Sequence, residues 1–547
     1  MSISLSLRLF TRNFSLAVGL SFLALLVGCE REPRTDHRLT LTISSDPGTL
    51  DPAFAKDVDS GIIVGYIYGN LVRFDHEMNL VGDIAQGFSV DPDARTYRFP
   101  LSDNAFFASG QPVTAEDVRF SFERVLSPEV GSPRAWVLDR IRGAKEFIAG
   151  KADHVEGIRI SGREIVLELE TPFAPFLGLL TMPAAAIVEK VQVEALGKSF
   201  HEKAAGSGPF KLVRWQRDAE LILELKAGAG SLVQGLDGVV IRILKEPLTL
   251  VSEFRLGNLD VIQVPSQAFA TLWSDPRFAN QHLSRPGLNF FYVGLNCESG
   301  PFSDRRVRRA AAMAIDRDRI IKLVREGQAV PAHGPIPPSL PGYDASYPGL
   351  SYDPDAAREL LAEAKRPPGT KIRFLQGDRK ANVEVTQLVK AFLERVGFEV
   401  ELMTFEWNIF RKRVDRGAYD AFYLSWFADY ADAENFLFPL FHSSRVGGAG
   451  NAPRYVSRQV DQWLEKALRT IDDAARVALY RSIERQVVED ASRIFLFHKS
   501  ELWLHQPWIS GYQLYPVFNG NRLDDVSVDA SAFAVSPKPL SGTLVSP

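Results

Sequence analysis

The feature that most constrains the fold is an alternation of strand and helix patterns in the second half of the chain. KIRFLQG at 371–377 has the pattern of a strand, VEVTQLVKAFLERVG at 383–397 that of an amphipathic helix, and FEVELMTF at 398–405 that of a second strand. Two strands joined by such a helix pair in parallel, because the helix carries the chain back across the sheet. The sequence therefore predicts an α/β lobe built on a parallel sheet.

The first half of the chain has a different pattern. TYRFPL at 96–101 and IRISGREIVLELE at 158–170 alternate as strands of antiparallel hairpins. Between them VTAEDVRFSFERVL predicts a helix with Thr114 and Asp117 as a capping pair. These elements indicate an α+β module, and the 547 residues of the chain suggest about three domains.

The N-terminus has the pattern of an export signal. Arg8 and Arg12 precede an apolar run from Phe14 to Val27, which ends at Gly28 and Cys29. Leu-Val-Gly-Cys resembles a lipobox, so we expect a signal peptide at 1–28, a lipidated Cys29 and a polar linker at 29–39; a buried or amphipathic N-terminal helix is the alternative. If Cys29 is acylated, Cys297 stands alone and no intramolecular disulfide forms.

Charge and motifs argue against several functions. With 63 basic and 67 acidic residues, no global charge attracts nucleic acid. GxSxG, HExxH, CxxC and GxxxxGK are absent, and the nine histidines are scattered, so we expect no enzyme, no cofactor and no metal. The basic run RRVRR at 305–309 is expected to form the solvated face of a helix or to dock a partner protein.

The stretch SWFADYADAENFL at 425–437 alternates aromatic and acidic residues. It predicts either a packed turn that leads into a helix or a pocket for a cationic, partly apolar ligand. Asp432 is expected to cap a helix over 433–441, and Glu434 to complement the dipole of that helix. Asp429 has no such structural explanation.

Seven segments together resemble extracellular solute-binding protein family 5, the peptide-binding receptors of ABC importers. They are TLDPAFAKD at 49–57, YGNLVRFD at 68–75, PVTAEDVRFSFERVLSP at 112–128, TPFAPFLGLL at 171–180, GSGPFKLVRW at 206–215, PFSDRRVRRAAAMAIDRDRI at 301–320 and AYDAFYLSWFADYADAENFL at 418–437. The resemblance runs from about residue 40 to 520 in family order.

The resemblance implies a two-lobed periplasmic-binding-protein fold of the large, three-domain peptide-binding subclass, α/β with an α+β extra domain. Lobe I would be discontinuous, the extra domain would pack on lobe I, and the crossings near 295 and 500 would be hinges. The implied ranges are 40–73, 207–295 and 501–547 for lobe I, 74–206 for the extra domain and 296–500 for lobe II.

The resemblance also implies a site. In peptide-binding members the acid after Trp-x-Ala pairs with the α-ammonium of the peptide, and here that acid is Asp429. Trp426, Phe427 and Tyr430 would cover apolar parts of the ligand, and strand edges near Asn296 would bind the peptide backbone.

The implied function is that of a lipoprotein at the periplasm or cell surface that captures di- or oligopeptides. It would deliver them to a membrane permease driven by an ATPase on separate chains, and would act as a monomer. Tyr423 stands where some members carry an arginine for the ligand carboxylate, and KAGAGSLVQGLDG at 226–238 departs from the usual pattern. The alternatives are a receptor for a metal chelate, glutathione, haem or a sugar, a signalling or adhesion lipoprotein, and an exported hydrolase.

Overall fold

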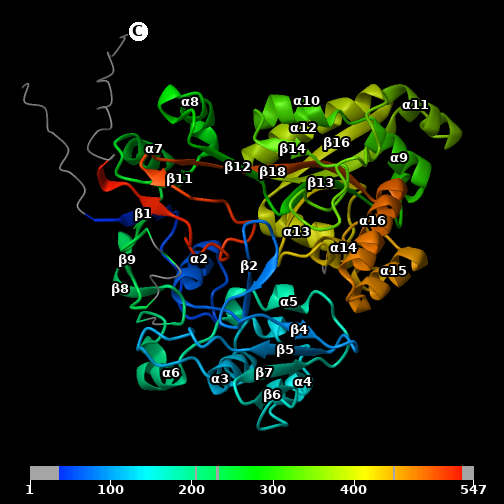
Figure 1. Ribbon diagram of the computed structural model, residues 1–547. Helices are drawn as coiled ribbons and strands as arrows, with labels where there is room; N and C mark the ends of the chain where they lie inside the picture. Colours follow the sequence, from blue (N-terminus) through cyan, green and yellow to red (C-terminus); the bar gives the residue numbers. More distant parts are fainter. Residues whose placement is uncertain (1–35, 204–205, 229–232, 234, 448–449, 532–547) are drawn as a thin grey trace, which may run out of the picture.

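The computed structural model describes residues 36–203, 206–228, 233, 235–447 and 450–531 (Figure 1). In Figure 1 one half of the molecule holds β1, α2 and, below them, a small antiparallel sheet; the other half holds β13, β16 and most of the long helices. The predicted signal peptide, Cys29 and most of the linker lie outside the described residues.

The first sheet has four strands in the order β1-β10-β9-β8. The strands are β1 (Arg38–Ile43), β10 (Gly238–Ile243), β9 (Glu220–Leu225) and β8 (Phe210–Gln216). β1 runs parallel to β10, whereas the other two pairs are antiparallel. Every second residue of β1 is buried, because RLTLTI has one apolar face, and α2 (Val58–Ile67) packs against β8.

The second sheet is fully antiparallel, in the order β4-β5-β7-β6. Its strands are β4 (Ser89–Val90), β5 (Thr96–Pro100), β7 (Glu164–Glu168) and β6 (Ile158–Ser161). The helix α3 (Ala115–Leu126) contacts β6 and β7, and it begins with the predicted capping box: the Asp117 N–H donates to Thr114 Oγ1 at 3.2 Å and the Thr114 N–H to Asp117 Oδ2 at 3.0 Å. The predicted α+β module is therefore confirmed.

The third sheet follows the order β11-β18-β13-β17-β15-β16, and β12 and β14 also pair with β18. Its strands are β11 (Val261–Gln263), β12 (His282–Pro286), β13 (Asn289–Leu295), β14 (Ala329–Pro331), β15 (Thr370–Gly377), β16 (Phe398–Phe405), β17 (Ala421–Phe427) and β18 (Arg493–His505). β15 is parallel to β16 and to β17, and α12 (Lys380–Arg395) joins β15 to β16. The predicted parallel β-α-β unit is confirmed.

The other elements connect or cover these sheets. The longer ones are α7 (Pro247–Arg255), α9 (Arg305–Met313), α11 (Pro354–Glu363), α13 (Trp407–Asp415), α14 (Glu434–Phe441), α15 (Arg458–Arg469) and α16 (Asp473–Asp490). The short ones are α4 (Ala144–Ile148), α5 (Phe176–Leu179), α6 (Lys190–Leu196), α8 (Phe269–Trp273), α10 (Arg317–Ile320), β2 (Val72–Phe74), β3 (Leu80–Gly82), β19 (Ile509–Ser510) and β20 (Ser527–Val528).

Two antiparallel runs of chain connect the two halves. The N-terminal part of β18 pairs with β13 and β14, and its C-terminal part pairs with β11 and β12. β12 and β13 are separated only by Gly287 and Leu288, so they follow β18 across the junction. The chain therefore passes between the halves twice within strands, while the residue boundaries of the lobes stay predictions.

The region of the predicted extra domain also contacts the other half of the molecule. The Ala174 N–H donates to the Leu468 carbonyl at 2.7 Å, and Tyr430 belongs to the apolar core beneath the second sheet. Cys297 is a free, partly buried thiol at the end of β13, and burial raises its pKa to about 11.

Candidate ligand-binding site

A cavity of about 570 Å³ lies between the first sheet and the third. Its walls come from β1, α2, the end of β17, the middle of β18 and the segment 512–518. Figure 1 places β1 and α2 in one half of the molecule and the start of β18 in the other. The cavity therefore lies where movement of the two halves would change its shape.

Asp429 lines this cavity, two residues after the end of β17. Its backbone N–H donates to Asn435 Oδ1 at 3.0 Å, which fixes the turn after the strand. Burial raises the pKa of the Asp429 carboxyl, while the positive charge of Arg134 and a hydrogen bond with Asn435 act in the opposite direction. Among the described residues no basic side chain forms an ion pair with Asp429 within 4.0 Å.

The structure brings two of the three predicted aromatic residues to Asp429. Phe427 is 58% exposed and lines the cavity, and Tyr430, although buried, contributes to the same wall. Trp426 points to the opposite face of β17 because side chains alternate along a strand, and it packs against the apolar core of the second half. Its Nε1 is buried and has no hydrogen-bond partner among the described residues.

Asn296 lies away from the cavity, after the far end of β13. It is 1% exposed, and its amide donates to the carbonyls of Tyr419 at 3.0 Å and Gly417 at 3.3 Å. β13 pairs with β17 on one side and β18 on the other, so it has no free edge for a peptide at this position. The structure does not bring Asn296 together with Asp429.

Asn289, at the start of β13, lines the cavity instead. Its side chain holds the backbone of Lys499: Nδ2 donates to the carbonyl at 3.1 Å, and Oδ1 accepts from the N–H at 2.8 Å. The sequence contains no local signal for this contact, because the two residues are 210 positions apart.

Sequence reasoning also missed the part of β18 that lines the cavity, residues 499–503. Lys499, Glu501 and Trp503 alternate with the buried Ser500 and Leu502, so they share one face of the strand. Burial lowers the pKa of Lys499 and raises that of Glu501, while the opposite charges of the two groups reduce both shifts. The alternation was visible in the sequence, but the partner of this face was not.

The helix after Asp429 begins close to the predicted position. α14 starts at Glu434, and Asp432 Oδ1 accepts from the Glu434 N–H at 2.8 Å, although the residue that directly precedes the helix is Ala433. Glu434 is in the first turn, as predicted, but it is buried, and burial raises its pKa to about 7. The Tyr430 hydroxyl donates to the Glu434 carboxylate and so connects the cavity wall to this helix.

The predicted cap of a second helix, α9, is displaced by one residue. α9 begins at Arg305, and its N-cap is Asp304, which accepts from the Arg306 N–H at 2.9 Å; the prediction of Ser303 as the cap is wrong. The arginines of RRVRR bind carbonyls and acids of the same half, and Arg308, which is 7% exposed, donates to the Asp490 carbonyl at 2.8 Å. The exposed face that was predicted for this run is thus only partly formed.

Among the described residues there is no cluster of three or more histidine, cysteine, aspartate or glutamate side chains that could hold a metal ion. In the same part of the chain, no helix combines the length and apolar character that a bilayer crossing requires.

The fold and the cavity define a solute-binding protein in which halves joined by crossing strands enclose a ligand space. Residues 79–448 match the profile of the bacterial extracellular solute-binding proteins, family 5. The match covers more than half of the chain, so the chain belongs to this family. Its architecture is the two-lobed fold of the large periplasmic peptide-binding proteins.

Three known proteins illustrate the similarity. The chain is 28% identical to di/tripeptide-binding protein 2 of Pseudomonas aeruginosa over 510 residues, which cover 89% of this chain and 94% of that protein. It superposes on the unliganded open form of the Escherichia coli periplasmic murein tripeptide-binding protein MppA with a TM-score of 0.82 and 25% identity, over 91% of this chain and 98% of MppA. For DppA of Helicobacter pylori in complex with the peptide STSA, the TM-score is 0.67 and the identity 27%, over 90% and 98% of the two chains.

The two TM-scores differ although the identities are similar. The chain is slightly more identical to the peptide complex, at 27%, yet it superposes better on the unliganded open form, at 0.82 against 0.67. The relative placement of the halves is therefore closer to that of the open form.

Proposed function

We propose that this chain is the substrate-binding lipoprotein of an ABC importer and that it captures short peptides in the cavity between its halves. It is held at the membrane by a lipidated Cys29, in the periplasm or at the cell surface, and it delivers the peptide to a permease driven by separate ATPase subunits. It acts as a monomer and catalyses no reaction itself. The names of two similar proteins, which state binding of di- or tripeptides, support this class of ligand, whereas other relatives are named for glutathione or haem.

One observation carries the proposal. The Asp429 carboxylate lines the cavity without a basic partner among the described residues, and Phe427 and Tyr430 lie beside it. A carboxylate in a partly dehydrated site is stabilised when a cation binds, and the α-ammonium of a peptide is such a cation. The aromatic rings then cover the apolar part of the first residue.

Closure couples binding to transport. Residues of both halves line the cavity, so a peptide contacts all of them only when the halves approach each other. Binding therefore favours the closed state by the difference between the affinities of the two states. The permease would distinguish the closed, loaded protein from the open one. In this proposal the lobes have the ranges given above, and 74–206 form the extra domain.

The test is Asp429→Asn, measured by isothermal titration with trialanine and N-acetyl-trialanine. A charge-assisted hydrogen bond contributes about 1.5–3 kcal/mol, so we expect the affinity for trialanine to fall about 10- to 100-fold. The acetylated peptide, which carries no ammonium, should bind both proteins with the same weak affinity. Asp153→Asn removes a charge from an exposed residue outside the cavity and should change neither affinity. Equal weakening for both peptides would remove Asp429 from this role.

A further inference from the structure

A loop of the second half is inserted into the first half beside the cavity. Tyr430 directly follows Asp429 and lines the cavity, yet it is only 8% exposed, because its ring packs into the apolar core beneath the second sheet. A Cβ at Gly178 of α5 would lie 3.6 Å from Tyr430 Cδ2, which is an ordinary packing distance. The loop therefore connects the wall of the cavity to that core.

The two halves meet at further points around this loop. Leu468, in α15, packs against the same core, and its carbonyl accepts a hydrogen bond from the Ala174 N–H at 2.7 Å. The Arg140 guanidinium carbon lies 3.8 Å from the ring centroid of Phe173, and its positive charge acts on the pKa of Tyr430. The halves are thus connected here as well as through the strands of the junction.

The first turn of α14 holds this loop in place. The Tyr430 hydroxyl donates to the carboxylate of Glu434, and the Asp429 N–H donates to Asn435 Oδ1 at 3.0 Å. Glu434 is 5% exposed and forms no ion pair within 4.0 Å among the described residues. Because Asp429 and Tyr430 are neighbours in the chain, the contact that fixes the Tyr430 ring also limits where the Asp429 carboxylate can lie.

The charges around Glu434 decide which of its protonation states fits this place. Burial is the main cause that raises its pKa to about 7, and the negative charge of Asp432 acts in the same direction. The hydrogen bond from Tyr430 and the positive charges of Arg140 and Arg445 act against the shift. The side chain is therefore neutral below about pH 7, and ionisation brings a charge into a largely dehydrated contact.

Asp432, the other acid at this place, has partners of its own. Its Oδ1 accepts from the Tyr480 hydroxyl and from the Glu434 N–H, both at 2.8 Å. Burial raises the pKa of Asp432, whereas the positive charge of Arg476 is the largest cause that lowers it. A charge on Glu434 would thus lie close to a carboxylate that already has these partners, and like charges in a buried place repel.

We propose that Glu434 is a positioning residue for the ligand site: its neutral side chain holds Tyr430 in the core beneath the second sheet and so keeps Asp429 at the wall of the cavity. Ionisation of Glu434 weakens this contact, so the capture of a ligand falls as the pH rises through neutrality. This inference rests on the proposed function, in which Asp429 binds the ammonium of the peptide.

The direction of the pH effect follows from proton linkage. While the loop is docked, Glu434 holds its proton more tightly than a hydrated carboxyl, whose ordinary pKa is 4.5. The docked arrangement is therefore most stable at low pH and loses stability as the pH rises from about 4.5 to about 7. The apparent affinity for a ligand falls in proportion to the fraction of the protein that can bind it.

The test is Glu434→Gln, titrated with trialanine at pH 5.5 and at pH 7.5. Glutamine cannot ionise, and its Oε1 can still accept from the Tyr430 hydroxyl. The two proteins should bind trialanine equally at pH 5.5. A group with a pKa of about 7 is protonated in about a quarter of the molecules at pH 7.5, so the wild type should then bind about fourfold more weakly than the variant. Asp429 and the peptide ammonium titrate in both experiments, so their effects cancel in the ratio of affinities.

Glu484→Gln is the matched control. Glu484 is a buried acid of the same half whose pKa burial also raises, but it lies outside the cavity and accepts from the Ile336 N–H instead of from the loop. Its substitution should change the Tm with pH and leave the ratio of affinities constant, which separates a positioning role from an effect on stability alone.

Tyr430→Phe gives a second readout, because it keeps the ring and removes the hydroxyl that Glu434 binds. It should weaken trialanine binding about 2- to 10-fold at pH 5.5, as expected for the loss of one hydrogen bond. A ratio for Glu434→Gln that is the same at both pH values, or an unchanged affinity in Tyr430→Phe, would overturn the inference and leave the proposed function intact. The proposed function fails instead if the wild type binds trialanine and N-acetyl-trialanine equally at pH 5.5.

Discussion

At the scale of single residues, the interior of this protein strongly disfavours charge. Glu484 is 3% exposed and its Oε1 accepts one backbone hydrogen bond, from the Ile336 N–H at 3.2 Å; burial raises its pKa to about 8. His498 is fully buried, and burial lowers its pKa to about 4. Because the Asn289 carbonyl can only accept, the proton of His498 lies on Nδ1, 2.6 Å away. Both side chains are thus neutral near pH 7, in contrast to the charged residues that line the cavity.

This predicts a pH-dependent effect of Glu484→Gln. The pKa in the folded protein, about 8, is above the ordinary value of 4.5, so the folded state holds the proton more tightly than the unfolded chain. The carboxyl therefore loses stabilising free energy as the pH rises from about 4.5 to about 8, and glutamine does not. We expect the Tm of Glu484→Gln to exceed that of the wild type most clearly at pH 8.5 and least at pH 5, measured by circular dichroism.

His498 is present in both proteins, so its own titration cancels in this difference. Glu359→Gln, at an exposed position, is the control and should show the same small Tm difference at both pH values. Parallel pH profiles for Glu484→Gln and the wild type would show that Glu484 is ionised in the folded protein throughout.

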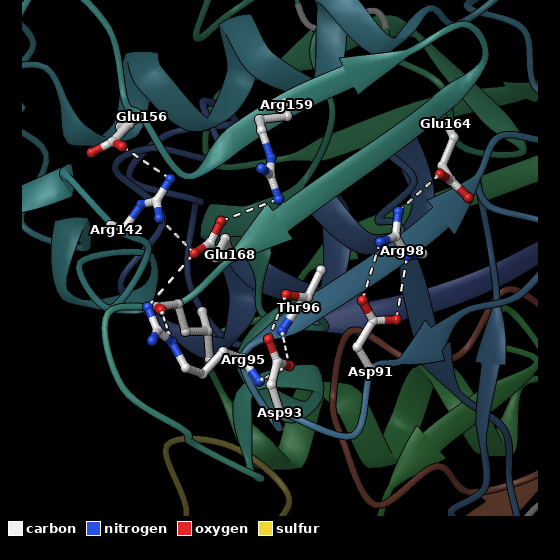
Figure 2. A network of polar contacts seen from close by, with 11 residues as sticks. Asp91, Asp93, Arg95, Thr96, Arg98, Arg142, Glu156, Arg159, Glu164 and Glu168 are labelled. Carbon is white, nitrogen blue, oxygen red and sulfur yellow. Dashed lines mark hydrogen bonds and ion pairs between the residues drawn. The ribbon is translucent and has the colours of Figure 1, made fainter.

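At the scale of elements, ion pairs between neighbouring segments stabilise the second sheet. Figure 2 shows Glu168 surrounded by three arginines: Arg142 at 2.6 Å, Arg159 at 3.1 Å and Arg95 at 3.6 Å. They come from three neighbouring segments, and the Glu168 side chain is only 14% exposed. A largely buried carboxylate shared by several cations contributes more to stability than an isolated surface pair.

We therefore expect Glu168→Gln to lower the free energy of unfolding by about 1–2 kcal/mol, because three arginines then face each other without a compensating charge. Urea denaturation would measure this, and high salt should reduce the difference. Among the described residues Glu164 forms an ion pair only with Arg98, at 3.7 Å, so Glu164→Gln should cost less than about 0.5 kcal/mol. An equal effect of the two substitutions would mean that the network adds nothing to its single pairs.

Local elements could be predicted from the sequence because their signals are local. The capping box at Thr114 and Asp117 and the strand patterns on both sides of α12 are complete within short windows, and the structure has them where expected. The cavity could be predicted only in part. Asp429 and Phe427 belong to one quoted stretch, but Lys499 joins them through hydrogen bonds to the Asn289 side chain, 210 positions away, which no local pattern contains.

At the scale of the whole molecule, the site depends on the two runs of chain that join the halves, β18 and the β12–β13 segment. β18 runs through 13 residues from one half into the other, and Gly287 lies at the corresponding break between β12 and β13. A Cβ at Gly287 would lie 2.5 Å from Asn289 Nδ2 and 3.1 Å from the Lys499 carbonyl oxygen, so a side chain there would disturb the hydrogen bond between these two groups, one of several that join the two runs. The strands that join the halves thus also position Lys499 on the cavity wall.

The open arrangement predicts compaction on binding. The chain superposes better on an unliganded open relative than on a peptide complex, with TM-scores of 0.82 and 0.67, and the cavity walls come from both halves. A peptide that neutralises Asp429 should draw the halves together, because its contacts with the far wall form only on closure. Small-angle X-ray scattering should show a smaller radius of gyration with saturating trialanine than without it. N-acetyl-trialanine at the same concentration should leave the radius unchanged, since it brings no cation to Asp429; an unchanged radius with bound trialanine would mean that the open form itself is the ligand-bound state.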